Sequence, residues 1–188
     1  PDFDTPKFIV ETAIKALIEG ETRYGPAAGD PYLRQAIADK VSIINNIPTK
    51  QNNVLITNGG KQAIFNLIQS IINPGDEVII PSPYWLSYPS IVQLASGNPV
   101  IISSRAEDGF KLDIEKLESV ITNKTKLLIL NSPCNPTGRV LLKSELESIA
   151  ELLRKHPNIY VMSDEIYEYL ISENSNHISL GSIATDLI

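Results

Sequence analysis

Short runs of Val, Ile and Leu alternate with amphipathic stretches from Val54 onward. Each run is bounded by Gly, Pro or Asn and has the length expected of a strand that is buried on both faces. Five strands are therefore predicted: Val54–Thr57, Glu77–Pro81, Pro99–Ser103, Lys126–Asn131 and Ile159–Ser163. Because strands that alternate with helices form parallel sheets, the pattern predicts an α/β fold with a mostly parallel sheet flanked by helices on both faces.

The stretches between these strands have the period of amphipathic helices. The predicted helices are Thr12–Glu19, Leu33–Asn45, Lys61–Ile72, Trp85–Ala95, Asp113–Ile121 and Lys143–Lys155. In the last of them Leu146, Ile149, Ala150 and Leu153 share one face, and Glu145, Glu147 and Arg154 lie outside it. We therefore expect an N-terminal helical segment over residues 1–50 that leads into a larger α/β domain over residues 51–188.

Composition narrows the class of protein. A chain of 188 residues that is 43% hydrophobic can bury a core, so it forms one domain or one large piece of a bigger one. A net charge of −6 without any Lys/Arg run argues against nucleic acid or a membrane surface as partner. The single cysteine, Cys134, excludes an internal disulfide and indicates a reducing, cytoplasmic location. No metal site is predicted.

Polar segments follow three of the predicted strands, where ligands bind in parallel α/β sheets. The first, Thr57-Asn58-Gly59-Gly60-Lys61, runs directly into a helix, whose free N–H groups can bind an anion. The segment matches neither the dinucleotide-binding nor the P-loop pattern, so it gives a nucleotide site no support. An ordinary strand–helix turn would also account for it.

The other two polar segments carry an asparagine and a carboxylate. Asn131-Ser132-Pro133-Cys134-Asn135-Pro136-Thr137-Gly138 is stiffened by prolines, whose peptide bonds are candidates for cis geometry, and could hold Asn135 at a fixed angle. Cys134 is expected to be a small packed residue. Asp164 follows the apolar run Ile159–Met162, where it could meet a cation or cap a helix. Trp85, the only tryptophan, could be a core or site aromatic.

Taken in order, these segments resemble the fold-type I aminotransferases that depend on pyridoxal phosphate (PLP), specifically the prokaryotic branch of the aspartate aminotransferase family. The match covers nearly the whole chain, and its order is more specific than any one motif. The matching segments are Asp2–Pro6, Tyr24–Pro26, Asn58–Gln62, Pro81–Trp85, Asn131–Gly138 and Ser163–Tyr167. The resemblance implies that the chain is part of the large, PLP-binding domain of such an enzyme.

The resemblance also implies roles for individual residues. Asp164 would pair with the pyridine nitrogen of PLP and keep it protonated, and Trp85 would stack on the ring. Asn135 and Tyr167 would hydrogen-bond the phenolic oxygen of the cofactor. Trp85 and Asn135 would also border the substrate.

Three further residues match positions around the cofactor phosphate. Gly60 and Lys61 correspond to the helix start that holds this phosphate, and Lys61 could in addition meet the side-chain carboxylate of an acidic substrate. A solvated lysine that supplies only its backbone N–H is the alternative. Tyr24 corresponds to a tyrosine that reaches the phosphate of a neighbouring subunit, which implies a homodimer.

In this family a lysine forms the Schiff base with the cofactor and then moves the proton. Lys155 is the last lysine of the chain, so we expect the Schiff-base lysine to lie beyond Ile188, and the opening Pro1–Pro6 is typical of the middle of a loop. The expected function is transfer of an amino group between an amino acid, with aspartate favoured, and a 2-oxo acid, only in a complete protein. A PLP-dependent C–S lyase or synthase, a silent fragment and an aminotransferase-like regulatory domain are the alternatives.

Overall fold

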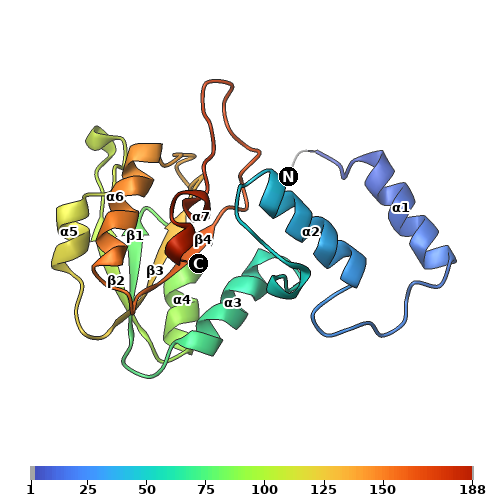
Figure 1. Cartoon of the computed structure of the whole chain (residues 1–188), viewed down its shortest axis with the longest axis horizontal. Coiled ribbons are helices and arrows are strands. Elements are labelled where there is room, and N and C mark those ends of the chain that lie inside the picture. The colour runs from blue at the N-terminus through green and yellow to red at the C-terminus, as the bar shows by residue number, and fades with distance from the viewer. Residues whose placement is uncertain (1–2, 188) are drawn as a thin grey trace.

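A four-stranded parallel sheet forms the centre of the molecule in the computed structural model, which describes residues 3–187 (Figure 1). Pro1 and Asp2 of the predicted opening loop, and Ile188, lie outside this range. The strands are β1 (Glu77–Ser82), β2 (Asn98–Ser103), β3 (Thr125–Asn131) and β4 (Tyr160–Asp164), in the order β2-β1-β3-β4. The sheet confirms the predicted fold class, and its edges are β2 and β4.

The two central strands are apolar because both of their faces are covered. Val78, Ile79 and Ile80 of β1 are at most 1% exposed, and the apolar residues 127–130 of β3 are nearly as enclosed. Side chains alternate between the faces of a strand. Accordingly Val78 and Ile80 belong to one apolar cluster and Ile79 to another on the opposite side.

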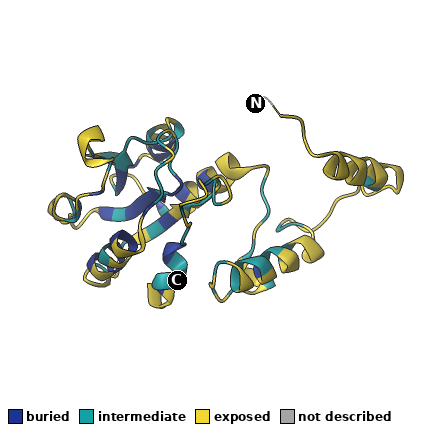
Figure 2. Ribbon diagram, turned by 90° about the horizontal axis from the view of Figure 1, so that it is seen from above, coloured by how far each residue is buried: buried dark blue, intermediate teal, exposed yellow. Residues whose placement is uncertain are grey.

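Helices cover both faces of the sheet (Figures 1 and 2). The first cluster includes residues of α3 (Gly60–Ile71) and α4 (Ser87–Leu94). The second includes residues of α5 (Ile114–Ser119), α6 (Lys143–Arg154) and α7 (Leu180–Ile183). Short 3₁₀ turns lie at Gln51–Asn53, Ala106–Asp108 and Thr185–Leu187. Among the described residues no helix is long and apolar enough to cross a membrane.

The first two helices project from this body as an arm (Figure 1). They are α1 (Lys7–Ile18) and α2 (Pro31–Ile43), so α1 begins before the predicted Thr12. No residue of α1 is buried, and Ala38 is the only buried residue of α2; in Figure 2 α1 is almost wholly yellow, whereas α2 is partly teal. The arm therefore buries few side chains, and the partly buried residues of α2 are both apolar, such as Ile37 and Val41, and polar, such as Lys40.

The predicted strand Val54–Thr57 is wrong: this segment is irregular in the structure. A strand needs a neighbour for its backbone groups, and no other strand of the described chain pairs with this one. Its polar groups find other partners. The Arg34 guanidinium donates to the Val54 carbonyl at 2.8 Å, and the Ile56 N–H donates to the Ala28 carbonyl at 2.9 Å.

Glu145, which the sequence placed outside the apolar face of its helix, is buried, with an exposed fraction of 6%. Its carboxylate accepts a hydrogen bond from the Arg139 guanidinium at 2.5 Å and another from the Leu142 N–H at 2.9 Å. A buried carboxylate is stable only when such partners satisfy it. Arg139 lies outside the helix, so the helical period could not reveal this pair.

Candidate active site

A cavity of about 190 Å³ lies at the carboxyl ends of the strands, where the polar segments of the sequence predicted a ligand site. Six of the seven residues predicted to bind a cofactor line it: Gly60, Lys61, Trp85, Asn135, Asp164 and Tyr167. Tyr88, Asn131, Ile64 and Ile166 line it too, and sequence reasoning gave them no role. The seventh predicted residue, Tyr24, is fully exposed in the loop between α1 and α2 and borders a separate hollow.

Asp164 ends β4, where its backbone pairs with Asn131 of β3. One carboxylate oxygen accepts a hydrogen bond from the Tyr88 hydroxyl at 2.6 Å, and the other faces the Ile166 N–H at 3.3 Å. Tyr88 is 1% exposed. Its burial, and then the hydrogen bond and charge of Asp164, raise the pKa of the Tyr88 phenol, so the phenol keeps its proton and donates a hydrogen bond to the carboxylate. This bond orients Asp164.

Asn131 connects the Asn135 loop to β4. Its amide nitrogen donates to the backbone carbonyls of Asp164 at 2.9 Å and Pro133 at 3.1 Å. Its side-chain oxygen accepts from the N–H of Asn135 at 2.7 Å. The Ser132–Pro133 and Asn135–Pro136 bonds are cis, as the sequence suggested, and so is Ser82–Pro83, for which no prediction was made. The three hydrogen bonds of the Asn131 side chain hold the loop that carries Asn135 against the end of β4.

The start of α3 offers unpaired donors to the cavity. Gly59 precedes the helix with φ +82°, a conformation that favours glycine, and no side chain caps the helix. Within residues 3–187 the N–H groups of Gly60 and Lys61 have no acceptor. Free first-turn amides and the helix dipole suit an anionic group such as a phosphate.

Lys61 and Trp85 face each other across the cavity wall. The Lys61 ammonium lies 5.2 Å from the centroid of the Trp85 ring, in cation–π geometry. The Trp85 ring in turn meets Tyr88 edge to face, with centroids 5.4 Å apart and an angle of 84° between the planes. Tyr88 thus contacts both the aromatic face and the carboxylate of the site, and the cavity can hold a flat ring that carries an anion and a protonated nitrogen.

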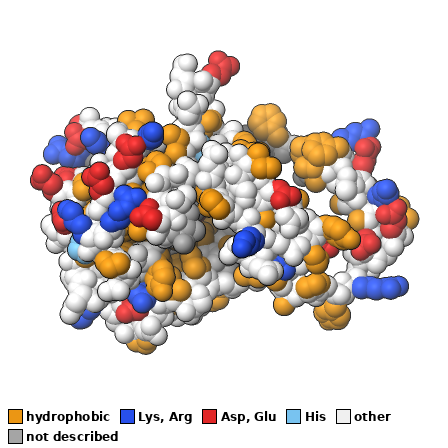
Figure 3. Space-filling model, viewed as in Figure 1, with side chains coloured by type: hydrophobic (Ala, Val, Ile, Leu, Met, Phe, Trp, Pro, Cys, Tyr) orange, Lys and Arg blue, Asp and Glu red, His pale blue; other side chains and the backbone are white. Residues whose placement is uncertain are grey.

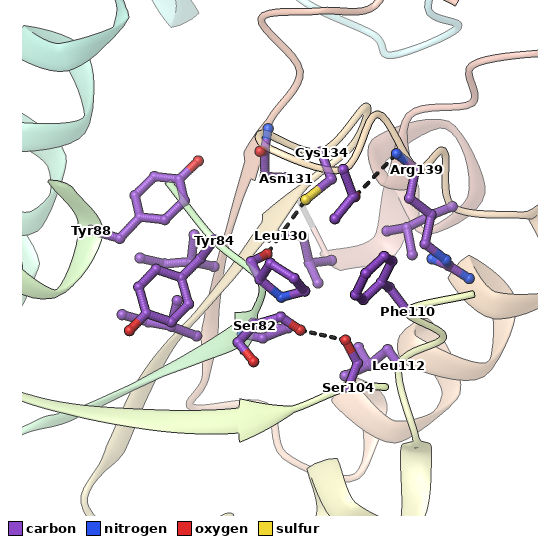
Figure 4. Close-up of a pocket in the computed structure, with 16 residues that line it drawn as sticks. Ser82, Tyr84, Tyr88, Ser104, Phe110, Leu112, Leu130, Asn131, Cys134 and Arg139 are labelled. Atoms are coloured by element: carbon purple, nitrogen blue, oxygen red, sulfur yellow. Dashed lines mark hydrogen bonds between the residues drawn. The ribbon is translucent and has the colours of Figure 1, made fainter. Parts of the chain in front are cut away.

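A smaller cavity of about 60 Å³ lies behind the Asn135 loop (Figure 4). Mostly apolar side chains, including Phe110, Leu112 and Leu130, line it. The half-buried Cys134 thiol lies 3.5 Å from the Pro83 carbonyl, and the Cys134 N–H donates to the Arg139 carbonyl at 2.9 Å. These contacts give Cys134 a packing role against the segment that precedes Trp85.

The parallel sheet and its cavity define the class of protein to which the chain belongs. A family model described as aminotransferase class I and II matches residues 1–186. The chain therefore belongs to the class I and II aminotransferase family, whose members are PLP-dependent.

Within this family, the chain is similar to individual aminotransferases of known sequence or structure. The chain is 51% identical to a probable aspartate/prephenate aminotransferase of Rickettsia bellii, over all of this chain and 47% of that protein. It superposes on an aspartate aminotransferase from Thermus thermophilus, solved with maleate, with a TM-score of 0.94 and 48% identity over 98% of this chain and 48% of that one. For an aromatic aminotransferase from Pyrococcus horikoshii the TM-score is 0.93, at 43% identity over 97% and 48%. The chain spans about half the length of the relatives it matches.

Proposed function

We propose that this chain is the cofactor-binding part of an aminotransferase that moves an amino group between an amino acid and a 2-oxo acid. The observation that carries the proposal is the cavity in which the Asp164 carboxylate, the Trp85 ring and the free amides of α3 lie together. In this proposal residues 51–188 belong to the PLP-binding domain, residues 1–50 form the segment that leads into it, and the protein works in the cytoplasm.

The residues of the cavity fit PLP by the chemistry of their groups. PLP supplies an electron sink that lets the substrate Cα–H bond break. Asp164, oriented by Tyr88, would hold the ring nitrogen in its protonated form. Trp85 would fix the plane of the ring, and the amides of Gly60 and Lys61 would bind the phosphate. Asn135 and Tyr167 would bind the phenolic oxygen.

Aspartate is the proposed amino acid substrate, and Lys61 would select it. The Lys61 ammonium lies over Trp85 at the cavity, with no carboxylate partner in the described chain, so it can meet a substrate carboxylate. The Thermus relative was solved with maleate, a dicarboxylate. Lys61→Ala in a complete enzyme should raise KM for aspartate at least tenfold more than KM for an apolar amino acid. Equal effects on the two substrates would contradict this role.

Aspartate aminotransferases are generally dimeric, and we propose that the complete protein is a homodimer. The proposal rests on Tyr24, which is fully exposed and does not line the cavity of its own chain. A neighbouring subunit would accept this tyrosine near its phosphate site. Tyr24→Phe should then weaken PLP binding in the complete dimer, although Tyr24 takes no part in the cavity described above.

The decisive experiment supplies the remaining half of the fold. In this fusion residues 1–188 would replace the matching 48% of the Thermus relative, so that every part of the relative that this chain does not match is kept. We expect the fusion to bind PLP and to convert aspartate and 2-oxoglutarate into oxaloacetate and glutamate. Asp164→Ala in the same fusion is the control and should lose at least a hundredfold in rate.

Product analysis separates the alternatives. Release of ammonia or of a sulfur fragment, without transfer to the 2-oxo acid, would favour a lyase or synthase. PLP binding without turnover would favour a regulatory domain. With the 188-residue chain alone, borohydride reduction in the presence of PLP should leave no specific lysine adduct, since no lysine follows Asp164.

A further inference from the structure

Tyr167 lies beyond the end of the sheet, in a turn that is held by the side-chain contacts of Glu165 and, on the side of α2, of Glu168. Asp164 is fixed by strand pairing, but Tyr167 comes three residues later. The Glu168 N–H closes a turn onto the Glu165 carbonyl at 3.0 Å, and the Leu170 N–H bonds the Tyr167 carbonyl at 2.8 Å. Within the described chain the Tyr167 hydroxyl has no hydrogen bond that would hold it in place.

The carboxylate of Glu165, the first residue of this turn, is largely buried, and both of its oxygens have hydrogen-bond partners. One of its oxygens accepts hydrogen bonds from the hydroxyls of Ser163 and Ser179, each at 2.7 Å. The other lies 3.0 Å from Nε2 of His177. The side chain of Glu165 is 18% exposed and that of His177 only 7%. Burying a carboxylate is costly unless it is paired, so Glu165 can occupy this place only while these partners are present.

The partners of Glu165 connect the turn to the core on the far side of the sheet. His177 and Ser179 lie 12 and 14 residues further along the chain, directly before α7. Leu180, the first residue of α7, belongs to the apolar cluster beneath β3 and β4. The loop between Glu165 and His177 projects away from the body in Figure 1. The chain comes back to the body at the contact of His177 and Ser179 with Glu165.

We propose that Glu165, held by His177 and Ser179, is a positioning residue that sets Tyr167 in the cavity. Asp164 does not need this anchor, because the sheet, Asn131 and Tyr88 already hold it. The functional consequence rests on the proposed role of Tyr167 at the cofactor, whereas the anchoring itself does not.

The anchoring is tested without cofactor, by amide hydrogen exchange on the 188-residue chain. In Glu165→Ala the amides of Glu168 and Leu170 should exchange about tenfold faster, since the turn keeps the contact of Glu168 with Lys40 and Asn45 but loses its contact with His177 and Ser179. The amide of Ser132, which donates to the Asp164 carbonyl at 3.1 Å, should keep its wild-type rate. Glu173→Ala is the matched control, because Glu173 is exposed on the same loop and has no side-chain bond within the described residues.

Two variants guard against a general loss of structure. Glu165→Gln keeps the volume and one acceptor oxygen, so it should give a smaller increase in exchange than Glu165→Ala. His177→Asn should reproduce the effect from the other side of the contact, whereas His156→Asn, at the only other histidine, should not. Unchanged exchange at Glu168 and Leu170 overturns the proposal. So does an equal rise at Ser132, which would mean that Glu165 supports the whole sheet.

The effect on the cofactor is tested in the fusion described above. The absorption spectrum of bound PLP, followed against pH, should shift in Glu165→Ala in the direction seen for Tyr167→Phe and partly recover in Glu165→Gln. A wild-type spectrum, or one that follows Asp164→Asn instead, overturns the role of Glu165 toward Tyr167. A fusion that binds no PLP overturns the proposed function, and the exchange experiment still decides the anchoring.

Discussion

At the scale of single residues, Tyr88 makes the shortest hydrogen bond among the residues that line the cavity. Its hydroxyl lies 2.6 Å from the Asp164 carboxylate, and the residue is almost wholly buried. Hydrogen bonds to charged groups contribute more than neutral ones. We expect Tyr88→Phe to lower the free energy of unfolding by about 2 kcal/mol, measured by urea denaturation of the chain.

Tyr84→Phe is the matched control for this variant. Tyr84 is half-buried nearby, and its hydroxyl has no hydrogen bond within residues 3–187. The same atom is removed without loss of a contact, so the stability should change by less than about 0.5 kcal/mol. Equal losses in the two variants would show that the Asp164 contact adds no stability.

The contrast between Asp164 and Tyr88 shows how much of the site the sequence could predict. Asp164 and Asn135 were predicted because polar residues after buried strands meet at one edge of a parallel sheet. Tyr88 was not, since its partner lies 76 residues away and the sequence around it shows only a helix. Asn131 was noticed as part of a motif, but its bond to the Asp164 backbone depends on the pairing of β3 with β4.

At the scale of elements, an ion pair connects α2 to the turn after β4. The Lys40 ammonium bonds the Glu168 carboxylate, and the Asn45 amide donates to its other oxygen at 2.9 Å. Burial raises the pKa of Glu168, but the bonds from Lys40 and Asn45 together outweigh it and leave the pKa lowered from 4.5. A carboxyl whose pKa is lower in the folded state stabilises the fold above its unfolded pKa. That stability is lost as the pH falls through the folded value.

Glu168→Gln should therefore destabilise the chain at neutral pH by about 1 kcal/mol and have a smaller effect in acid. The measurement is the urea midpoint of both proteins at pH 7 and at about pH 3, below the unfolded value. Glu173→Gln on the exposed loop should show no difference at either pH. A gap between Glu168→Gln and wild type that is as large in acid as at neutral pH would contradict the ion pair.

Local sequence patterns predicted some elements of the fold correctly and failed where an element or side chain depends on a distant partner. The amphipathic period predicted α3 and α6 to within a residue or two, because their apolar faces pack on the sheet. Val54–Thr57 has the composition of a strand, yet strand formation depends on a partner that the local sequence cannot supply. The burial of Glu145 could not be predicted from the helical period, because its partner Arg139 precedes the helix.

At the scale of the whole molecule, α1 carries apolar side chains that the rest of the described chain does not cover. Phe8 is 69% exposed, Leu17 64% and Ile18 81%, and Figure 3 shows hydrophobic side chains exposed on the arm. Exposed apolar surface of this kind favours association. We expect the chain to associate as its concentration rises, in sedimentation velocity experiments, through the apolar side chains of α1.

Phe8→Glu combined with Leu17→Glu should shift this association to at least tenfold higher concentration. No residue of α1 is buried, so the unfolding midpoint of a dilute sample should stay as it is. The control is Lys7→Gln with Lys15→Gln, which changes the net charge by the same two units on the same helix and keeps every apolar side chain. If the control dissociates as readily as the Glu variant, charge repulsion explains the effect. If only the Glu variant dissociates, the apolar side chains of α1 make the contact, because charge alone cannot distinguish the two proteins.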